Sequence, residues 1–214
     1  MRQRAYGGWT PICLFFAALV PLSGCEGDGQ GDTCGMAADC RNGLLCVDGG
    51  CAQVASTDPG SVYTDLATGL EWQHTPTGGD MDWESAVIHC QNLDLNGTGW
   101  RLPNISELRS LFRGCPATES GGACGVTDSC LSWDSGGCYN VACAGCELDA
   151  GPAGGCYWPE ELGGSCSPFY WSSSTAEATV DTVYDGAGWY VIFSFGHVCA
   201  RSKDFNFGPA RCVR

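Results

Sequence analysis

Seventeen cysteines in a chain of 214 residues constrain its fold more than any other feature of the sequence. In an oxidising compartment this density indicates disulfide bonds, which can hold together regions too poor in apolar residues to build a core. In the cytoplasm the same residues would stay reduced or bind a metal. Whether the cysteines form disulfides therefore depends on the compartment in which the protein folds. The N-terminal sequence indicates this compartment.

The N-terminus has the pattern of an export signal. Arg2 and Arg4 precede an uncharged, mostly apolar segment over 9–20, which is followed by small residues. A basic start, a short apolar run and small residues at its end are typical of a secretory signal. The run is too short to span a bilayer, which takes about 20 apolar residues. We expect residues 1–24 to be a signal peptide; a buried N-terminal helix or strand is the alternative.

The end of this segment, Leu22-Ser23-Gly24-Cys25, resembles the lipobox of bacterial lipoproteins. The resemblance implies that Cys25 is acylated and attaches the chain to a lipid bilayer, stably if it carries two or more acyl chains. Glu26, with no aspartate beside the cysteine, implies the outer membrane by analogy with lipoprotein sorting. The stretch 25–33 is rich in glycine and acidic residues, and we expect it to be a flexible tether.

The charge of the mature chain argues against nucleic acid as a partner. Cleavage after Gly24 removes two of the ten basic residues and no acid, which leaves eight against 24 and a formal charge of −16. Such a surface repels nucleic acid. No basic residue lies between Arg113 and Arg201, whereas ten acids do. This segment either meets a cation or a basic partner or is a solvated acidic face.

Four cysteines fall within eighteen residues near the mature N-terminus: Cys34, Cys40, Cys46 and Cys51. So short a segment cannot build a core, and we expect two disulfides, in one of three connectivities, within a small spacer module over 34–53. The pattern resembles two-disulfide modules of bacterial surface lipoproteins. Zinc would favour Cys-x2-Cys pairs, which this segment lacks. Loss of Cys13 and acylation of Cys25 leave fifteen cysteines, so at least one thiol is free or pairs between molecules.

From residue 61 the pattern becomes that of a globular domain. Two short strands around a turn at Asp65–Gly69 are predicted over 61–73, with Tyr63 and Trp72 as buried aromatic residues. Apolar residues then recur at helical spacing and predict an amphipathic helix over 82–95 with Cys90 on its inner face. We expect Asn96-Gly-Thr-Gly to end it.

A second helix is predicted to begin at Asn104. Glu107, three residues later, completes a capping box, and Leu108, Leu111 and Phe112 form the apolar stripe. Arg101 lies next to the Leu-Pro turn that precedes this helix. We expect it to hydrogen-bond loop carbonyls rather than a ligand.

Residues 115–168 form a glycine-rich segment with eight cysteines and no helical or strand period. We expect a crosslinked loop, and long ordered loops often carry function. The Cys143-Ala-Gly-Cys146 pair is expected to join this disulfide network, because no βαβ pattern of a redox site surrounds it. Rigid aromatic side chains suit stacking on a sugar or burial in a partner. The ligand-binding candidates are Trp133, Tyr139, Tyr157 and Trp158, and the alternative is that Trp133 and Trp158 pack a small core of the loop itself.

The C-terminal part is rich in aromatic and β-branched residues. Strands are predicted over 169–175 and 188–198, the second ending in a turn at Phe195-Gly196, with a short closing strand over 210–214. Helices early, strands late and a long loop between them indicate an α+β domain.

Together these residues resemble the Lcl C-terminal domain family of bacterial surface proteins. The matching pieces run in order from Ser61 to Arg214: Asp65–Trp72, Trp83–Leu93, Trp100-Arg-Leu-Pro with Glu107-Leu108, Tyr170-Trp171-Ser-Ser-Ser, Trp189-x-Val-x-Phe with Gly196, and Arg211-Cys-Val-Arg. The resemblance implies a C-type-lectin-like fold with two helices, a small antiparallel sheet and a long loop region. It also implies a disulfide between Cys90 on the first helix and Cys212 in the last strand.

The family resemblance implies a surface-binding role, because the adhesin that names the family binds sulfated polysaccharides. Sulfated glycans need lysine and arginine, which the loop region lacks. The Glu-Pro-Asn or Gln-Pro-Asp and Trp-Asn-Asp motifs of calcium-dependent lectins are also absent. Our hypothesis is a non-enzymatic, lipid-anchored surface protein that binds a glycan or a protein through the cysteine-rich loop, without a cofactor.

Calcium is a weaker expectation. The candidate oxygen ligands are Glu160, Glu161, Asp181 and Asp185. Calcium takes 6–8 oxygen ligands, and no spacing in this sequence specifies such a set.

Two alternatives remain from the sequence. The first is an oxidoreductase similar to formylglycine-generating enzymes of the same fold superfamily, using a reactive cysteine. No catalytic Cys-His pairing is visible, because His74, His89 and His197 have no shared spacing, and a Gly-x-Ser-x-Gly elbow is absent, so we do not predict an enzyme. The second alternative is a purely structural envelope component.

Overall fold

The structure is a computed structural model that describes residues 45–47, 50–52, 61–133, 137–177, 186–206 and 208–214. The chain divides into two units, 1–52 and 53–214. In the first, β1 (Leu45–Val47) and β2 (Gly50–Ala52) form an antiparallel hairpin in which Cys46 is the backbone partner of Cys51. The signal peptide, Cys25, the tether, Cys34 and Cys40 lie outside the described residues, and their roles stay predictions.

The second unit begins with the predicted hairpin. Strands β3 (Val62–Thr64) and β4 (Glu71–Gln73) pair antiparallel around a turn that Asp65 organises. The Asp65 carbonyl accepts a hydrogen bond from the Gly69 amide at 2.7 Å, and its carboxylate accepts one from the Thr68 hydroxyl at 2.7 Å. Gly69 has a φ of 74°, a conformation that glycine adopts without a steric penalty.

Helix α1 (Trp83–Gln91) begins as predicted and ends early. Asp82 caps it by accepting a hydrogen bond from the Ser85 amide at 2.8 Å. The predicted helix continued to residue 95, but the chain leaves the helix at Asn92, the C-cap, and the Leu93 amide donates to the Cys90 carbonyl in a tighter, three-residue turn. Ala86 and Cys90 form the buried side of α1.

Helix α2 (Ile105–Ser110) confirms the predicted capping box. The Asn104 side chain accepts a hydrogen bond from the Glu107 amide at 2.7 Å, and the Glu107 carboxylate accepts one from the Asn104 amide at 2.8 Å. The predicted stripe of Leu108, Leu111 and Phe112 is buried. Arg101 has a structural role, as expected, but its partner is a carboxylate: it binds Glu107 in a fork with distances of 2.6 and 2.7 Å.

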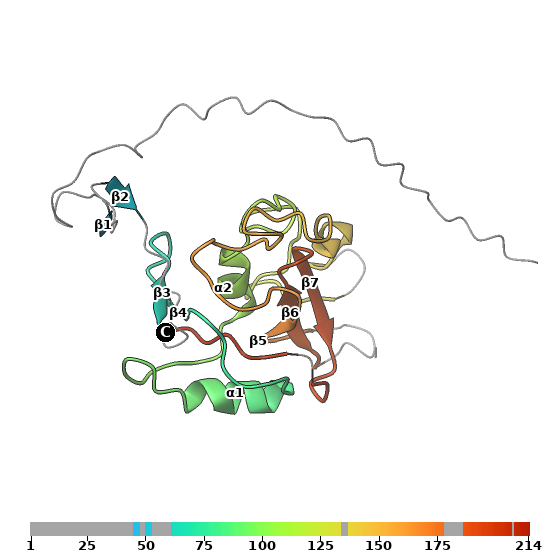
Figure 1. Cartoon of the computed structure of the whole chain (residues 1–214). Helices are drawn as coiled ribbons and strands as arrows, with labels where there is room; N and C mark the ends of the chain where they lie inside the picture. Colours follow the sequence, from blue (N-terminus) through green and yellow to red (C-terminus); the bar gives the residue numbers. More distant parts are fainter. Residues whose placement is uncertain (1–44, 48–49, 53–60, 134–136, 178–185, 207) are drawn as a thin grey trace, which may run out of the picture. The chain divides into compact units, whose positions relative to one another are not determined.

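A three-stranded antiparallel sheet follows, in the order β5-β6-β7 (Figure 1). Strand β5 (Phe169–Thr175) has the predicted bounds. The predicted strand over 188–198 is instead two strands, β6 (Gly188–Ile192) and β7 (His197–Arg201), because the chain reverses between them and Gly196 adopts a φ of 62°. Every residue of β6, the central strand, is buried.

The C-terminal segment closes the domain onto its beginning. The Gln73 amide donates to the Cys212 carbonyl, the Glu71 amide donates to the Arg214 carbonyl, and Val213 bridges both Trp72 and Arg101. The predicted closing strand is therefore a set of isolated bridges. A disulfide between Cys90 and Cys212, with Cα atoms 5.4 Å apart, ties this segment to α1 and confirms the implied pairing.

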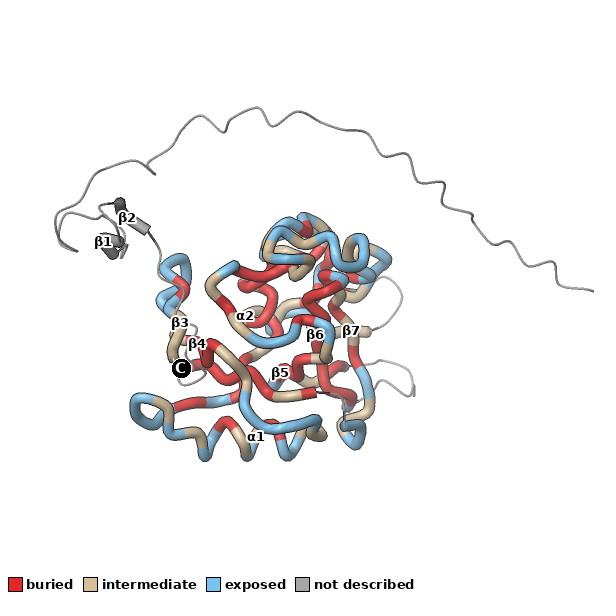
Figure 2. Tube along the Cα trace, in the orientation of Figure 1, coloured by how far each residue is buried: buried red, intermediate tan, exposed pale blue. Residues whose placement is uncertain are grey.

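Buried residues, many of them aromatic, form two core clusters, and buried stretches of the trace run through the sheet and both helices (Figure 2). The largest fully buried side chains are Trp72, Trp171, Trp189, Arg211, Tyr170, Phe112 and Phe193. The described part of the domain is thus a small α+β fold, as predicted. None of its helices has the length and apolar character that crossing a bilayer requires.

Removal of the Cys90–Cys212 disulfide should destabilise the domain more than removal of any shorter crosslink. The bond joins residues 122 apart. Loop-closure entropy then predicts that Cys90→Ala/Cys212→Ala lowers the free energy of unfolding by about 4–5 kcal/mol. Denaturant unfolding of the oxidised domain measures this.

The matched control is Cys130→Ala/Cys138→Ala, which opens a disulfide that joins residues only 8 apart. The same entropy argument predicts a loss of about 2.5 kcal/mol. Equal losses for the two double variants would contradict the entropic account.

Candidate functional site

The cysteine-rich loop over 115–168 is crosslinked by four disulfides among its eight cysteines: Cys115–Cys146, Cys124–Cys143, Cys130–Cys138 and Cys156–Cys166. Cys143 and Cys146 bond to different partners, so they join the network as predicted and do not form a redox pair. The only regular helical element described within the loop is the short 3-10 helix η2 (Val141–Ala144). Its shape therefore depends on crosslinks and individual hydrogen bonds.

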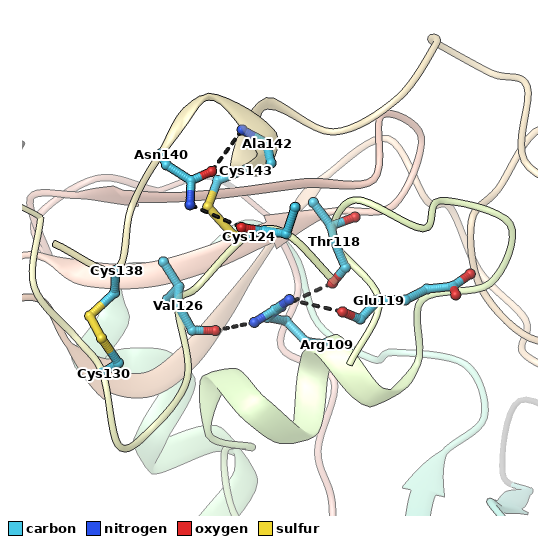
Figure 3. The surroundings of a disulfide bond; sticks show 11 residues. Arg109, Thr118, Glu119, Cys124, Val126, Cys130, Cys138, Asn140, Ala142 and Cys143 are labelled. Atoms are coloured by element: carbon cyan, nitrogen blue, oxygen red, sulfur yellow. Dashed lines mark hydrogen bonds between the residues drawn. A yellow bond between two sulfur atoms is a disulfide. The ribbon is translucent and has the colours of Figure 1, made fainter. Parts of the chain in front are cut away.

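Arg109 anchors the start of this loop to α2 (Figure 3). Its Nε donates to the Thr118 carbonyl at 2.9 Å, Nη2 donates to the Glu119 carbonyl at 2.9 Å, and Nη1 donates to the Val126 carbonyl. The side chain is buried, and burial lowers the pKa of its guanidinium. A cation held by three carbonyls fixes the loop as a rigid body. Sequence reasoning missed this residue, because it lies on an amphipathic helix like any surface arginine.

Two of the four predicted ligand-binding residues lie in the core. Tyr157 and Trp158 are each 3 % exposed. The Tyr157 hydroxyl donates to the Glu147 carbonyl at 2.7 Å, and the Trp158 ring packs on Phe193 with centroids 5.4 Å apart. The ligand-binding hypothesis needed exposed rings, whereas both rings are part of the main core cluster; the alternative expectation, that Trp158 packs internally, agrees with this burial.

The other two predicted residues lie together. Trp133 and Tyr139 stack with ring centroids 4.0 Å apart and planes 16° apart. Both rings also approach Trp189 of β6, at centroid distances of 5.5 and 6.2 Å. They are half-buried, so the pair is a partly exposed aromatic platform resting on the core. Its ligand-binding role stays a prediction.

A hollow of about 330 Å³ lies in the same loop, and Trp158 and Glu160 both line it, with the Cys156–Cys166 disulfide at its wall. Beneath it lies Arg211, which is fully buried and donates to the carbonyls of Gln73, His74 and Gly163. The Arg211 guanidinium also lies 4.7 Å from the centroid of the Trp158 ring.

The structure gives calcium no support beyond the sequence. Asp181 and Asp185 lie outside the described residues. Within the described ranges no three His, Cys, Asp or Glu side chains come together as a metal site, so Glu160 and Glu161 are not part of such a group.

Three exposed apolar side chains lie in segments that adjoin at the cysteine-rich loop, two in the loop itself (Val141 and Leu148) and one in the β6–β7 turn (Phe195), and we call them the apolar tip. Val141 is 90 % exposed, Leu148 is 50 % exposed and Phe195 is 38 % exposed. Their segments adjoin, because the Cys146 amide donates to the Phe195 carbonyl at 2.7 Å and the Asp149 amide donates to the Ser194 carbonyl at 2.8 Å. Sequence reasoning missed these residues, since isolated apolar residues in a loop carry no periodic signal.

Cys199 is the one free cysteine among the described residues. It is half-buried on β7, directly opposite Tyr190 of β6, and its thiol contributes with burial to a raised pKa of the Tyr190 hydroxyl. His197 is two residues away and meets the Tyr190 ring edge-on at 6.5 Å. Burial lowers the pKa of His197, so this imidazole is neutral at pH 7.

Replacing Arg109 should loosen the cysteine-rich loop. Arg109→Met removes the side-chain donor of two buried carbonyls, those of Thr118 and Val126, while the Glu119 carbonyl keeps the Gly122 amide, and we expect the free energy of unfolding to fall by about 3–5 kcal/mol. Proteolysis should then cut within 118–126 in the native protein. The control is Arg101→Gln, which removes a half-exposed ion pair and should cost about 1 kcal/mol or less. Equal costs would contradict the anchoring role.

A thiol count tests the enzyme alternative. The chain from residue 61 onward contains eleven cysteines, and the structure places ten in disulfides, so one thiol should react in denaturant and none in Cys199→Ser. In the native protein we expect slow reaction, because the Cys199 side chain is half-buried. Rapid native alkylation at neutral pH would favour catalysis instead.

Comparisons with known proteins bear on the family of the α+β domain. A search of curated proteins and a search of solved structures each returned no match to this chain. The family model of the Lcl C-terminal domain matches residues 61–214, which is the whole of the α+β domain described above. The chain therefore belongs to the Lcl C-terminal domain family.

Proposed function

We propose that this protein is a non-enzymatic, lipid-anchored surface protein. It binds a ligand through its cysteine-rich loop, and this ligand is a protein in preference to a glycan. The anchoring part of the proposal rests on the signal-like N-terminus and on the lipobox-like segment before Cys25. The binding part rests on the surface of the α+β domain.

The observation that carries the binding proposal is the apolar tip. Side chains such as Val141 and Leu148 gain free energy when a partner covers them, about 1.5–3 kcal/mol for a fully buried aliphatic residue. Val141 lies within the loops closed by Cys115–Cys146 and Cys124–Cys143, and Leu148 follows Cys146 by two residues. A crosslinked segment loses little conformational entropy when it binds, so more of the contact energy becomes affinity.

The charge distribution supports a protein partner over a sulfated glycan. No lysine or arginine lies between Arg113 and Arg201, and Glu147 and Asp149 flank the apolar tip. Sulfate groups would meet only carboxylates there. A neutral sugar remains compatible with the hollow beside Trp158 and with the Trp133–Tyr139 pair.

A C-type-lectin-like arrangement is part of the proposal. It is supported by the Cys90–Cys212 bridge between the first helix and the C-terminal segment, by the pairing of that segment with β4, and by the long loop inserted between α2 and β5. In such an arrangement the loop is the part free to vary with the ligand.

A binding screen tests the proposal. The mature chain with Cys25→Ser, oxidised during export, is applied to arrays of cell-surface proteins and of neutral and sulfated glycans. We expect a protein ligand whose affinity falls at least about tenfold in Val141→Asp/Leu148→Asp, because two apolar contacts are lost.

Leu66→Asp is the matched control. Leu66 is also an exposed apolar residue, 64 % accessible, but it lies in the β3–β4 turn away from the loop sequence. Binding should be unchanged in this variant. An absence of binding on both arrays, or equal losses of affinity in the two variants, would overturn the proposal. If the ligand is instead a neutral glycan whose binding requires Trp133, the loop is still the binding site, but the proposed protein partner is wrong.

A further inference from the structure

A cavity of about 440 Å³ lies outside the cysteine-rich loop, between α1 and the residues that follow β7. Its apolar wall is formed by Trp83, Val87 and Ile88, and Ile88 is 49 % exposed. The opposite side of α1 packs on the core through Ala86 and Cys90. Trp83 and Val87 also pack in part against the core, whereas Ile88 is exposed, so α1 presents apolar surface to the cavity as well as to the core.

Three carboxylates line the same cavity. Asp82 caps α1, Asp204 accepts a hydrogen bond from Ser202 at 3.4 Å, and Glu84 is exposed. None of them forms an ion pair within the described part of the chain. The cavity thus combines an apolar wall with carboxylates whose charge has no cationic partner.

The fold already places one cation on this wall. The Lys203 ammonium lies 3.8 Å from the centroid of a Trp83 ring and donates to the Thr175 hydroxyl at 2.8 Å. A lysine has an apolar stem and a charged head, so it can cover an indole while its ammonium meets oxygen atoms. The contact shows that the Trp83 side of the cavity accommodates such a side chain.

We propose that the cavity between α1 and residues 203–204 binds a basic, extended segment of a partner protein, with a lysine stem along Trp83 and Ile88 and its ammonium between Glu84 and Asp204. The lining carries three acids and one lysine, so a further cation is favoured and an anion is disfavoured. The acidic charge of the whole chain, −14, increases the local concentration of such a partner. This site is independent of binding through the cysteine-rich loop.

A hexalysine peptide is the probe. Added at low ionic strength to the ¹⁵N-labelled mature chain with Cys25→Ser, it should shift the indole N–H resonance of Trp83 in a saturable way, and salt should weaken the effect. This indole N–H donates to the Ser172 carbonyl at 2.8 Å, which gives it a fixed environment in the free protein. Binding without a shift of this resonance would overturn the proposal.

Matched charge variants separate the cavity from general attraction. Glu84→Gln/Asp204→Asn should weaken hexalysine binding about fivefold, as expected for the loss of two exposed charge pairs. Asp94→Asn/Glu177→Gln removes the same charge from exposed residues outside the cavity and should change binding less than about twofold. Equal weakening in the two variants would contradict the proposed site.

Replacing Lys203 should strengthen hexalysine binding, the opposite effect to replacing the carboxylates. Lys203→Gln removes the intramolecular cation from the Trp83 ring, so hexalysine should bind about threefold more tightly. Arg201→Gln removes the same charge from a residue that lies over the exposed Phe205 ring instead, and binding should change less. If Lys203→Gln binds hexalysine more weakly while its amide spectrum shows an unchanged fold, Lys203 does not compete with the peptide for the Trp83 ring. That result would overturn the proposed placement of a partner lysine on Trp83.

Discussion

The Cys90–Cys212 disulfide is the interaction on which the rest of the domain depends. It fastens the inner side of α1 to the segment that pairs with β4, and so it brings together the first and last parts of a 154-residue domain. With the ends fixed in this way, the residues between them can include a long excursion that contributes little regular structure. The excursion then needs only its own crosslinks to hold its shape.

Two buried arginines hold that excursion to the fold. Arg109 donates to carbonyls of 118–126, and Arg211 donates to carbonyls of residues 73, 74 and 163. Neither forms an ion pair with a carboxylate among the described residues. Carbonyls at loop ends have no partners in a sheet or helix, and a guanidinium with five N–H groups satisfies several at once. The interior is therefore organised by polar contacts as well as by aromatic packing.

The sequence was sufficient where local rules decide the structure. Hydrogen bonding between neighbouring groups defines the Asn104–Glu107 capping box, and a run of aromatic residues marks β5, so both were predicted with their positions. The loop was predicted only as a loop. Which of its side chains face outward depends on how four sulfur–sulfur bonds pair eight cysteines, and no local pattern distinguishes the buried Trp158 from the half-buried Trp133. The exposure of the residues of the apolar tip also depends on these bonds, so the sequence did not reveal them either.

Three of the loop disulfides are nested: Cys130–Cys138 lies within Cys124–Cys143, which lies within Cys115–Cys146. A chain that enters an oxidising compartment from its N-terminus exposes each outer cysteine long before its native partner arrives. The first bonds to form are then between neighbours in sequence, and most of them are wrong. Thiol–disulfide exchange is the reaction that converts such pairings into the nested set.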